Sequence, residues 1–243
     1  MNPLASQVAV VTGAARGTGA AIAQRLASMG AHVALVARSV DQLHQVRDRI
    51  LESGGAASVF PCDLMDDHAV SRFSKAFTQQ HTRCDILVNN AGIGIEGKFL
   101  HEVTPGEWDQ IFATNLRGPY LMIRALAPLM IEARSGHIIN ISSLAGRNPL
   151  PKGAAYAASK WGLNGLTYSV AEELRAYNIR VSVIAPGSIN TDFGDHAGRG
   201  AASGKDPNKK LQPDDIASVV ATLVTQAPQS FISEVLLRPT QKP

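Results

Sequence analysis

Short apolar runs alternate with longer amphipathic segments along most of this chain. Seven runs of four or five residues are rich in aliphatic and β-branched side chains. Strands that are apolar on both faces are typical of a parallel sheet covered by helices on both sides. We therefore predict an α/β fold with a doubly wound parallel sheet of seven strands. The expected strands are 8–11, 32–36, 57–60, 85–88, 137–141, 180–184 and 234–237.

Apolar residues at helical spacing fill the intervals between these strands. Thr104-Pro105-Gly106-Glu107 combines a capping hydroxyl, a proline at the first helical position and a glutamate three residues after the cap. This pattern predicts one long helix from Thr104 to about Arg134. The other expected helices are 20–29, one ending near Ser53, 67–80, 155–177 and 214–225.

No internal repeat or linker divides the 243 residues, so we expect one domain from residue 1 to residue 243. One segment differs from the rest, because Asp192 to Lys210 is rich in Gly, Ala and Lys and has no periodicity. Such a composition is typical of a mobile loop, which we expect to cover a substrate.

Composition narrows the classes of partner. Hydrophobic residues make up 45% of the chain and charged residues 18%, as in an ordinary globular protein with a sizeable core. The net charge of +3 and the isoelectric point near 9.0 permit weak attraction to anions. The basic residues are scattered, and no aromatic side chains interleave with them, so nucleic-acid binding is not expected.

The sequence also argues against export, membrane insertion and a metal site. The first residues, MNPLASQ, lack the apolar run of a secretory signal. The most apolar helical stretch, around 120–131, is interrupted by Arg124 and Pro128 and is too short to span a bilayer. Cys62 and Cys84 form neither a CxxC pair nor a cluster with histidines. We expect a reduced, cytoplasmic protein without a metal.

A glycine-rich turn from Thr12 to Gly19 connects the first strand to the first helix. Glycines permit positive φ and let the backbone approach a phosphate, which the N–H groups at a helix start can bind. Taken alone, the spacing also suits an ordinary tight turn.

Tyr156 and Lys160 are four residues apart, so both side chains lie on one face of a helix. An ammonium beside a phenol lowers a phenol pKa that is normally about 10, as a proton donor at neutral pH requires. Ser143 lies upstream, just past the fifth strand, where its hydroxyl can bind a carbonyl oxygen. Taken singly, each of these could be an incidental surface residue.

Together these motifs resemble the short-chain dehydrogenase/reductase family over nearly the whole chain, from Val8 to about Leu237. TGAARGTG resembles the family's TGxxxGxG cofactor turn, and residues 89–92 resemble its NNAG motif after the fourth strand. Pro186-Gly187, followed by Thr191, resembles the segment beside the nicotinamide. The resemblance implies a Rossmann-type fold that binds a nicotinamide cofactor.

The resemblance also implies a role for each of four residues. Tyr156 protonates the nascent alkoxide in reduction, or accepts the proton in oxidation. Lys160 lowers the pKa of Tyr156 and binds the nicotinamide ribose hydroxyls. Ser143 orients the substrate oxygen, and Asn115, in the long helix, anchors a water of a proton relay.

The expected cofactor site follows from the same resemblance. Asp63 and Leu64 contact the adenine, although Asp63 could equally cap the next helix. The segment 90–92 passes close to the adenosine ribose, and Ile189 and Thr191 meet the carboxamide. The full set is Gly13, Ala15, Arg16, Gly17, Thr18, Gly19, Arg38, Ser39, Asp63, Leu64, Asn90, Ala91, Gly92, Tyr156, Lys160, Pro186, Gly187, Ile189 and Thr191.

The end of the second strand predicts the choice of cofactor. It reads Val36-Ala37-Arg38-Ser39, without the acidic residue that binds the ribose 2′-hydroxyl in NAD enzymes. Arg16 and Arg38 belong to the neighbouring turns, and a guanidinium suits a 2′-phosphate. We therefore predict NADP(H).

Two positions depart from the family pattern. Thr18 stands where the family usually has isoleucine, and its hydroxyl can still meet a pyrophosphate. The last strand runs into Leu237-Arg238-Pro239-Thr240, where many members end in V-D-G-G, which leaves the C-terminal contacts open.

The expected substrate is a small, mostly apolar carbonyl compound or alcohol. The alternative is a 3-oxoacyl thioester of acyl carrier protein or coenzyme A. Basic residues of the loop could bind the phosphate of such a substrate or its acidic carrier protein. Glu172 and Glu173 on the helix after Lys160 would repel an acidic partner. The pocket residues are Ile93, Leu144, Ala145, Leu150, Ile189 and Phe193, and the basic loop residues are Arg199, Lys205, Lys209 and Lys210.

A remote alternative is a non-catalytic protein that senses NADP, since fold does not determine function. The intact set of four catalytic residues argues against it. The resemblance further implies a homodimer or homotetramer, with the helices that start at Thr104 and Ala155 as contact faces.

Overall fold

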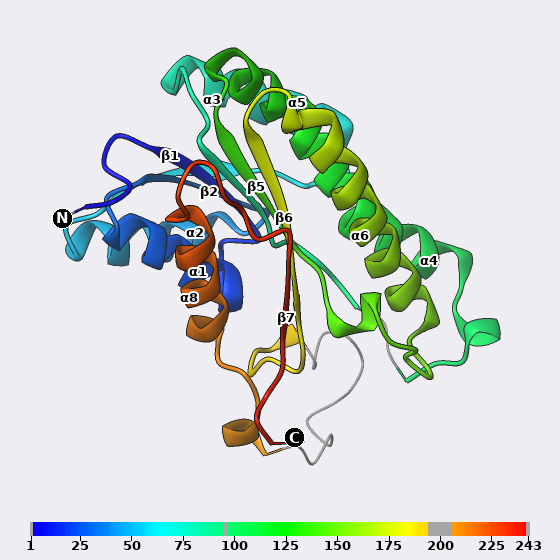
Figure 1. Ribbon diagram of the computed structural model, residues 1–243. Coiled ribbons are helices and arrows are strands. Elements are labelled where there is room, and N and C mark those ends of the chain that lie inside the picture. Colours follow the sequence, from blue (N-terminus) through cyan, green and yellow to red (C-terminus); the bar gives the residue numbers. More distant parts are fainter. Residues whose placement is uncertain (1, 95–96, 194–205, 242–243) are drawn as a thin grey trace.

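The computed structural model, which describes residues 2–94, 97–193 and 206–241, contains a seven-stranded parallel sheet in the order β3-β2-β1-β4-β5-β6-β7 (Figure 1). The chain builds β1, β2 and β3 outward, then returns to place β4 on the other side of β1. This reversal brings the loops after β1 and β4 together at the carboxyl ends of the strands, beside the crevice where ligands bind in such sheets. The predicted fold class is confirmed. The strands are β1 (Val8–Thr12), β2 (His32–Ala37), β3 (Ala56–Pro61), β4 (Ile86–Asn89), β5 (Gly136–Ile141), β6 (Ile179–Pro186) and β7 (Glu234–Leu237).

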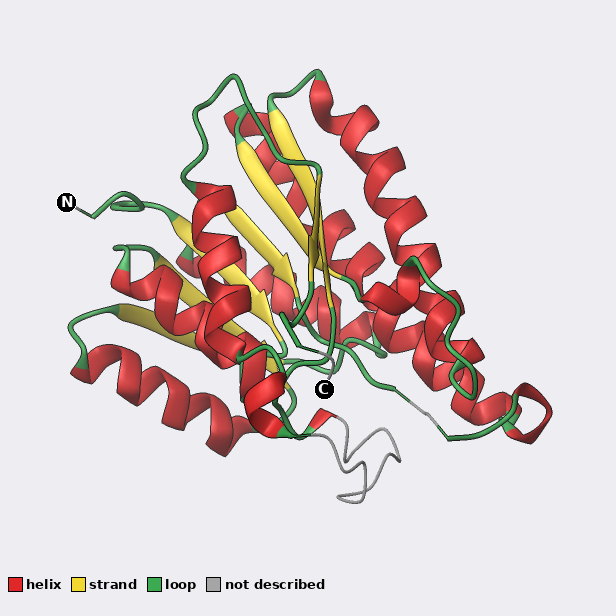
Figure 2. Ribbon diagram, turned by 60° about the horizontal axis from the view of Figure 1, so that its bottom comes forward, coloured by secondary structure: helices red, strands yellow, loops and turns green. Residues whose placement is uncertain are grey.

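Helices cover both faces of the sheet (Figures 1 and 2). One layer contains α1 (Gly17–Ser28), α2 (Val40–Glu52) and α8 (Pro213–Val224), and the other contains α3 (Asp67–Gln80), α5 (Gly118–Ala133) and α6 (Ala154–Arg175). Successive residues of β1 pack on opposite faces: Val11 joins the core below α1 and α8, and Val10 joins the core below α3 and α5. The apolar runs are therefore buried on both sides, as their sequence predicts.

The predicted long helix from Thr104 to Arg134 is wrong in one respect. Its start is confirmed, because the Thr104 hydroxyl accepts from the Glu107 N–H at 3.2 Å and a Glu107 carboxylate oxygen accepts from the Thr104 N–H at 2.8 Å. The helix is α4 (Pro105–Phe112), then a π-helical segment from Ala113 to Arg117, then α5. An α-helical bond to the carbonyl of Asn115 would need an N–H at Pro119, which has none, so the turn widens there.

Of the segment predicted to be a mobile loop, residues 194–205 lie outside the described residues, and with them Arg199 and Lys205. The part that follows is anchored beside β6. The Leu211 N–H donates to the Ser188 carbonyl at 2.9 Å, and the Asn190 N–H donates to the Leu211 carbonyl at 2.7 Å. Lys209 and Lys210 belong to a short 3₁₀ turn (Pro207–Lys209) and the residue after it.

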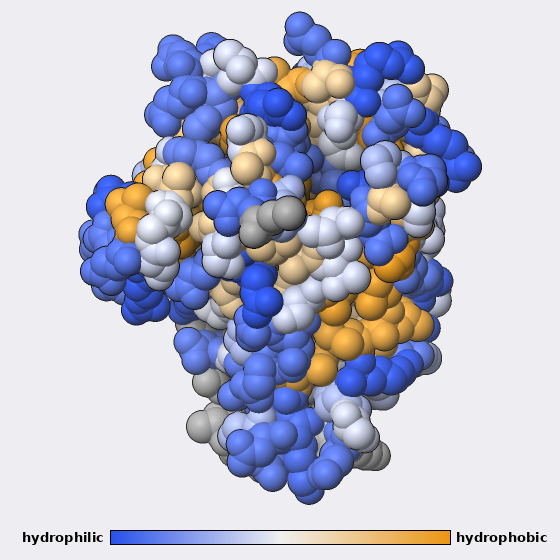
Figure 3. Space-filling model, turned by 60° about the vertical axis from the view of Figure 1, so that its left-hand side comes forward, coloured by the Kyte–Doolittle hydropathy of each residue, from blue (hydrophilic) through white to orange (hydrophobic). Residues whose placement is uncertain are grey.

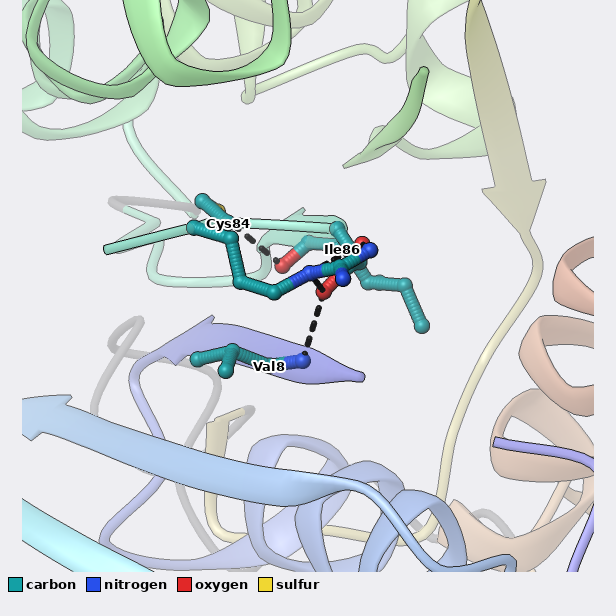
Figure 4. Close-up of polar contacts among 5 residues, drawn as sticks. Val8, Cys84 and Ile86 are labelled. Atoms are coloured by element: carbon teal, nitrogen blue, oxygen red, sulfur yellow. Dashed lines mark hydrogen bonds and ion pairs between the residues drawn. The ribbon is translucent and has the colours of Figure 1, made fainter. Parts of the chain in front are cut away.

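The amino ends of β1 and β4 are joined by a carboxylate at the edge opposite the crevice. Asp85 accepts from the Val8 N–H at 2.8 Å and binds Arg83 through both carboxylate oxygens (Figure 4). Beside it, the Cys84 thiol lies 3.7 Å from the Ile86 carbonyl. This cluster stabilises the sheet far from the crevice.

The surface of the molecule is mostly polar on the side shown in Figure 3, and the described residues contain neither a membrane-spanning helix nor a metal-binding cluster. The side shown in Figure 3 is mostly hydrophilic, with an apolar area towards its right-hand edge. No helix in the described ranges is long and apolar enough to cross a membrane. Among the same residues, no group of three or more His, Cys, Asp and Glu side chains could hold a metal ion.

Candidate active site

A cleft of about 1570 Å³ opens at the carboxyl ends of the strands. Its walls come from the turn after β1, the ends of β2 and β3, the loops after β4 and β5, the start of α6 and the segment after β6. Parallel strands expose their carboxyl ends at one edge, so the fold brings together residues that are far apart in the chain.

The glycine turn forms one end of this cleft. Gly13 and Gly17 have positive φ angles of +64° and +54°, which residues other than glycine rarely adopt. A Cβ on Gly19 would lie 2.1 Å from the Gly13 carbonyl oxygen, so only glycine allows the turn to close this tightly. The first turn of α1 has no acidic residue, and its N-cap, Arg16, makes no side-chain capping bond. The N–H groups of this helix start are therefore available to an anion.

Thr12 joins this turn to the motif after β4. Its buried hydroxyl accepts from the N–H groups of Asn90 and Ala91 at 3.0 and 3.1 Å, and the Asn90 amide donates to the Thr12 carbonyl at 3.0 Å. A Cβ on Gly13 would lie 2.9 Å from the Ala91 Cα. The two loops consequently form one rigid wall of the cleft.

Tyr156 and Lys160 lie on the face of α6 that turns towards the cleft, and both side chains are buried. The Lys160 ammonium lies 5.8 Å from the centre of the Tyr156 ring and donates to the Ile141 carbonyl at 2.9 Å. Burial lowers the pKa of Lys160 to about 8. A cation held at this place favours negative charge on the neighbouring phenol oxygen.

Asn115 lies behind the cleft and is fully buried in the π-helical segment. Its side chain accepts from the Ile93 N–H at 2.8 Å and donates to the Ile93 carbonyl at 2.8 Å and to the Ser159 hydroxyl at 3.0 Å. These bonds use both amide protons and one lone pair of the amide oxygen, so a relay water could bind only an acceptor of Asn115, either the remaining lone pair or the backbone carbonyl. A Cβ on Gly92 would lie 3.3 Å from the Asn115 amide oxygen and 3.5 Å from the Lys160 nitrogen, which places both close to the cleft floor.

Ser143 follows β5 with an extended backbone and lines the cleft. Its hydroxyl accepts from the Ala145 N–H at 3.1 Å, and its own proton can be donated to a substrate oxygen. Phe193 packs against Tyr156 with ring centres 5.9 Å apart, within a small apolar cluster that also contains Ala145 and Leu150. This end of the cleft therefore combines three polar groups, those of Ser143, Tyr156 and Lys160, with apolar walls.

Two open points of the sequence are decided by these contacts. Asp63 does not cap α3: it accepts from the Met65 N–H at 3.0 Å, and Asp66 is the N-cap, accepting from the His68 N–H. The C-terminal segment still reaches the cleft, because the Leu237 carbonyl accepts from the Gly187 N–H at 2.8 Å.

All residues expected for the cofactor and the pocket line this one cleft, whereas Asn115 stands behind it. Lys210 also lines it, while Lys209, Glu172 and Glu173 are exposed elsewhere on the surface, and Glu172 is paired with Arg175. The cleft has further lining residues that sequence reasoning missed. They belong to no sequence motif, although several follow a strand directly, and this position could have identified them as residues of the cleft. They are Val36, Ala37, Gln42, Cys62, Met65, Gly94, Gln110, Thr114, Ile141, Ser142, Asn148, Pro149, Ser188, Asn190 and Asp192.

Comparison with known proteins identifies relatives of the whole chain. Residues 7–201 match the profile of the family described as short chain dehydrogenase. An uncharacterized oxidoreductase of Staphylococcus aureus (strain N315) is 32% identical over 239 residues, which covers 98% of this chain and all of the relative.

Two solved structures extend this result. A metagenomic short-chain oxidoreductase in complex with NADP is 55% identical, with a TM-score of 0.86 over 99% of this chain and 100% of that one. An alcohol dehydrogenase of the archaeon Thermococcus sibiricus, complexed with 5-hydroxy-NADP, is 31% identical, with a TM-score of 0.88 over 98% of both chains.

Proposed function

Because the chain belongs to the short-chain dehydrogenase/reductase family of oxidoreductases, we propose that it transfers hydride between NADP(H) and a carbonyl or secondary alcohol carbon of a small, mostly apolar substrate. The observation that carries this proposal is the pairing of Tyr156 with the buried ammonium of Lys160 at the floor of the cleft that also contains the glycine turn.

The residues of the cleft fit a dinucleotide. Gly13, Gly17 and Gly19 let the turn after β1 close tightly where a Cβ would meet other parts of the chain, and the start of α1, which has no side-chain cap, lines the same cleft. A pyrophosphate would be held by these N–H groups, and Asp63 and Leu64 would contact the adenine.

NADP(H) rather than NAD(H) is favoured by charge at the end of β2. Arg16 and Arg38 are exposed and line the cleft, and the Ser39 side chain makes no capping bond to α2. A guanidinium binds a phosphate through charge-assisted hydrogen bonds, worth about 1.5–3 kcal/mol each before solvent reduces them. The two solved relatives above contain NADP or a hydroxylated NADP, which supports this choice.

The chain's own groups would handle the proton and the substrate oxygen. The nicotinamide supplies or accepts the hydride when it is bound. Tyr156 donates its phenol proton to the developing alkoxide in reduction, and takes it back in oxidation. Lys160 stabilises the resulting phenolate and binds the ribose, and Ser143 donates to the substrate oxygen. Asn115 holds the Ile93 loop in place and offers an acceptor oxygen to a relay water.

The substrate is proposed from the walls of the pocket. Ile93, Leu144, Leu150 and Phe193 present aliphatic and aromatic surface, which suits a small hydrophobic ketone or its alcohol. A 3-oxoacyl thioester remains the second candidate, because Lys210, one of the basic residues of the loop, lines the cleft and could attract a phosphate or an acidic carrier.

We also propose that the chain forms a homodimer or homotetramer through its helices. An apolar groove of about 580 Å³ runs over α4, the π-helical segment and α6, and Tyr120 and Trp161 are half exposed nearby. This groove and the two aromatic side chains give the helices an apolar surface that a second copy of the chain could cover. Leu116→Asp, at the centre of the groove, should therefore reduce the molar mass measured by light scattering to that of a single chain. We propose a cytoplasmic location for the protein, in which Cys62 and Cys84 are both free thiols.

The function is tested by measuring NADPH oxidation with diketones, aldehydes, sugars, steroids and 3-oxoacyl thioesters. Turnover with a small carbonyl compound is expected, and Tyr156→Phe should lower it about 10²–10⁴-fold while NADPH still binds. A preference for the thioesters would move the substrate to the second candidate. NADPH binding without turnover of any carbonyl would favour the non-catalytic alternative, and near wild-type activity of Tyr156→Phe would refute the role of Tyr156.

A further inference from the structure

Three side chains from distant parts of the chain meet behind the segment that follows Ser143, outside the set used above. Arg147 follows the 3₁₀ turn Leu144–Gly146, Tyr168 belongs to α6, and Glu234 begins β7. The Arg147 guanidinium donates to both carboxylate oxygens of Glu234, at 2.7 and 2.5 Å, and also to the Tyr168 hydroxyl. We call these three residues the Arg147 clamp.

The clamp is more than a solvated surface pair. The Arg147 and Glu234 side chains are only 34% and 26% exposed, and the Arg147 guanidinium lies 5.3 Å from the centre of the Tyr168 ring. Two parallel bonds between a guanidinium and a carboxylate define an orientation as well as a distance. The bond to Glu234 raises the pKa of Arg147, so the guanidinium is charged at every physiological pH.

The segment that the clamp holds contains the groups that would touch the substrate. Ser143 precedes Arg147 by four residues, and Leu144, Ala145 and Leu150 line the cleft. Apart from one 3₁₀ turn, this segment has no regular structure of its own and depends on side chains for its place.

Helix α6 supplies these side chains at regular intervals. Lys160 donates to the Ile141 carbonyl at 2.9 Å, and Asn164 donates to the Gly146 carbonyl at 2.9 Å. Tyr168, four residues further on, contacts Arg147. Residues four apart share one helix face, so the three contacts hold the Ser143 segment along a single stripe of α6.

The clamp adds a connection that α6 alone cannot provide. Glu234 lies on β7, and at the other end of β7 the Leu237 carbonyl binds the Gly187 N–H. A Cβ on Gly187 would lie 3.3 Å from Leu144. Strand β7 therefore holds the Pro186–Thr191 wall and, through Glu234, the Ser143 wall that faces it.

We propose that Arg147 is a positioning residue, whose clamp to Glu234 and Tyr168 places Ser143 and the apolar wall at Leu144 correctly relative to Tyr156. The inference rests on the proposed function, since it assumes that the substrate binds between these groups. A misplacement of about 1 Å can lower a rate about 100-fold, so removal of the clamp should be visible in turnover.

The test compares Arg147→Ala with Arg83→Ala. Arg83 makes the matching two-bonded pair with Asp85 at the opposite edge of the sheet. Both variants should lower the unfolding temperature. Only Arg147→Ala should lower kcat/KM for the best carbonyl substrate, by about 10–100-fold, with Kd for NADPH changed less than about twofold. Arg147→Lys, which keeps the charge with one bond, should recover part of the loss. Arg147→Ala combined with Glu234→Ala should lose no more than the single variant, because both break one contact.

The proposal is overturned if Arg147→Ala and Arg83→Ala reduce stability alike and both retain wild-type kcat/KM. It is also overturned if Kd for NADPH rises as much as kcat/KM falls. Should Arg147→Ala fail to fold, Arg147→Lys and Glu234→Gln carry the same comparison. If the wild-type protein reduces no carbonyl, the proposed function fails. Amide hydrogen exchange then tests separately whether the clamp holds the Ser143 segment. Exchange over 143–150 should be faster in Arg147→Ala and unchanged in Arg83→Ala, and unchanged exchange in Arg147→Ala would overturn the clamp.

Discussion

Replacing Lys160 by methionine should stabilise the folded protein while removing the activity proposed for it. The ammonium is buried, and burial lowers its pKa from 10.5 to about 8. At about 1.4 kcal/mol for each pKa unit, the native state holds this charge at a cost of about 3 kcal/mol at neutral pH. Methionine has a similar length and no charge, but it leaves the Ile141 carbonyl without its donor, which costs about 1–2 kcal/mol. The net gain should be about 1–2 kcal/mol.

The gain depends on pH in a defined direction. Below pH 8, Lys160 is protonated in both the folded and the unfolded chain, so the wild-type protein carries the full cost. Between pH 8 and 10.5 the folded protein releases the proton while the unfolded chain retains it, and the cost declines to zero. The advantage of Lys160→Met should therefore be constant below pH 8 and shrink as the pH rises. It should change sign between about pH 9 and 10, where the remaining cost of the charge equals the loss from the missing hydrogen bond.

Urea unfolding without cofactor, followed by the fluorescence of the two tryptophans, measures this difference at pH 7 and pH 9.5. Lys75→Met is the matched control, since Lys75 is exposed on α3 and its replacement should shift stability little at either pH. A Lys160→Met variant that is less stable than the wild type at pH 7, or whose advantage grows with pH, would show that burial does not govern this lysine.

Three further outcomes follow from individual contacts. The wild-type kcat/KM should be at least about tenfold higher with NADPH than with NADH, and Arg38→Ala should reduce this ratio. Equal wild-type values would refute the NADP(H) assignment, and an unchanged ratio in the variant would assign the preference to Arg16. Gly19→Ala should abolish NADPH binding in fluorescence titration, because its Cβ would overlap a backbone oxygen at 2.1 Å, whereas Gly165→Ala on α6, with open space around it, should bind NADPH normally. Burial and the nearby Arg180 lower the pKa of His137 to about 3, so the free energy of unfolding should fall by up to about 1.4 kcal/mol per pH unit as the pH drops from 6.5 towards 3. His137→Gln should flatten this slope in urea titrations at acid pH, and an identical slope in the variant would contradict the role of His137.

The order of elements could be predicted because the signals are local in the chain. The apolar runs determine seven buried strands, and Thr104 with Glu107 marks a helix start by groups three residues apart. The candidate site was equally accessible where its residues form short motifs, such as the glycine turn or Tyr156 with Lys160. Each of these depends on geometry within one turn or one helix.

The widening of the helix at Asn115 could not be read with the same certainty. Pro119 was a local hint, but a proline near a helix start is also ordinary. What holds Asn115 in place is a pair of bonds to Ile93, 22 residues earlier, together with one to Ser159, 44 residues later. The sequence shows an asparagine in a helix, and the packing of three elements decides which of its atoms remain available.

The sequence by itself thus determined the strands, the layered fold and the side chains proposed for catalysis, because these depend on periodicity and on spacings of a few residues. Only the tertiary structure decided which loops share the cleft and what aligns them. Thr12 and Asn90 meet across 78 residues, and Arg147 and Glu234 across 87. No local pattern encodes such pairs, because their contact arises when parallel strands bring their carboxyl ends to one edge of the sheet and the helices fix the distance between them.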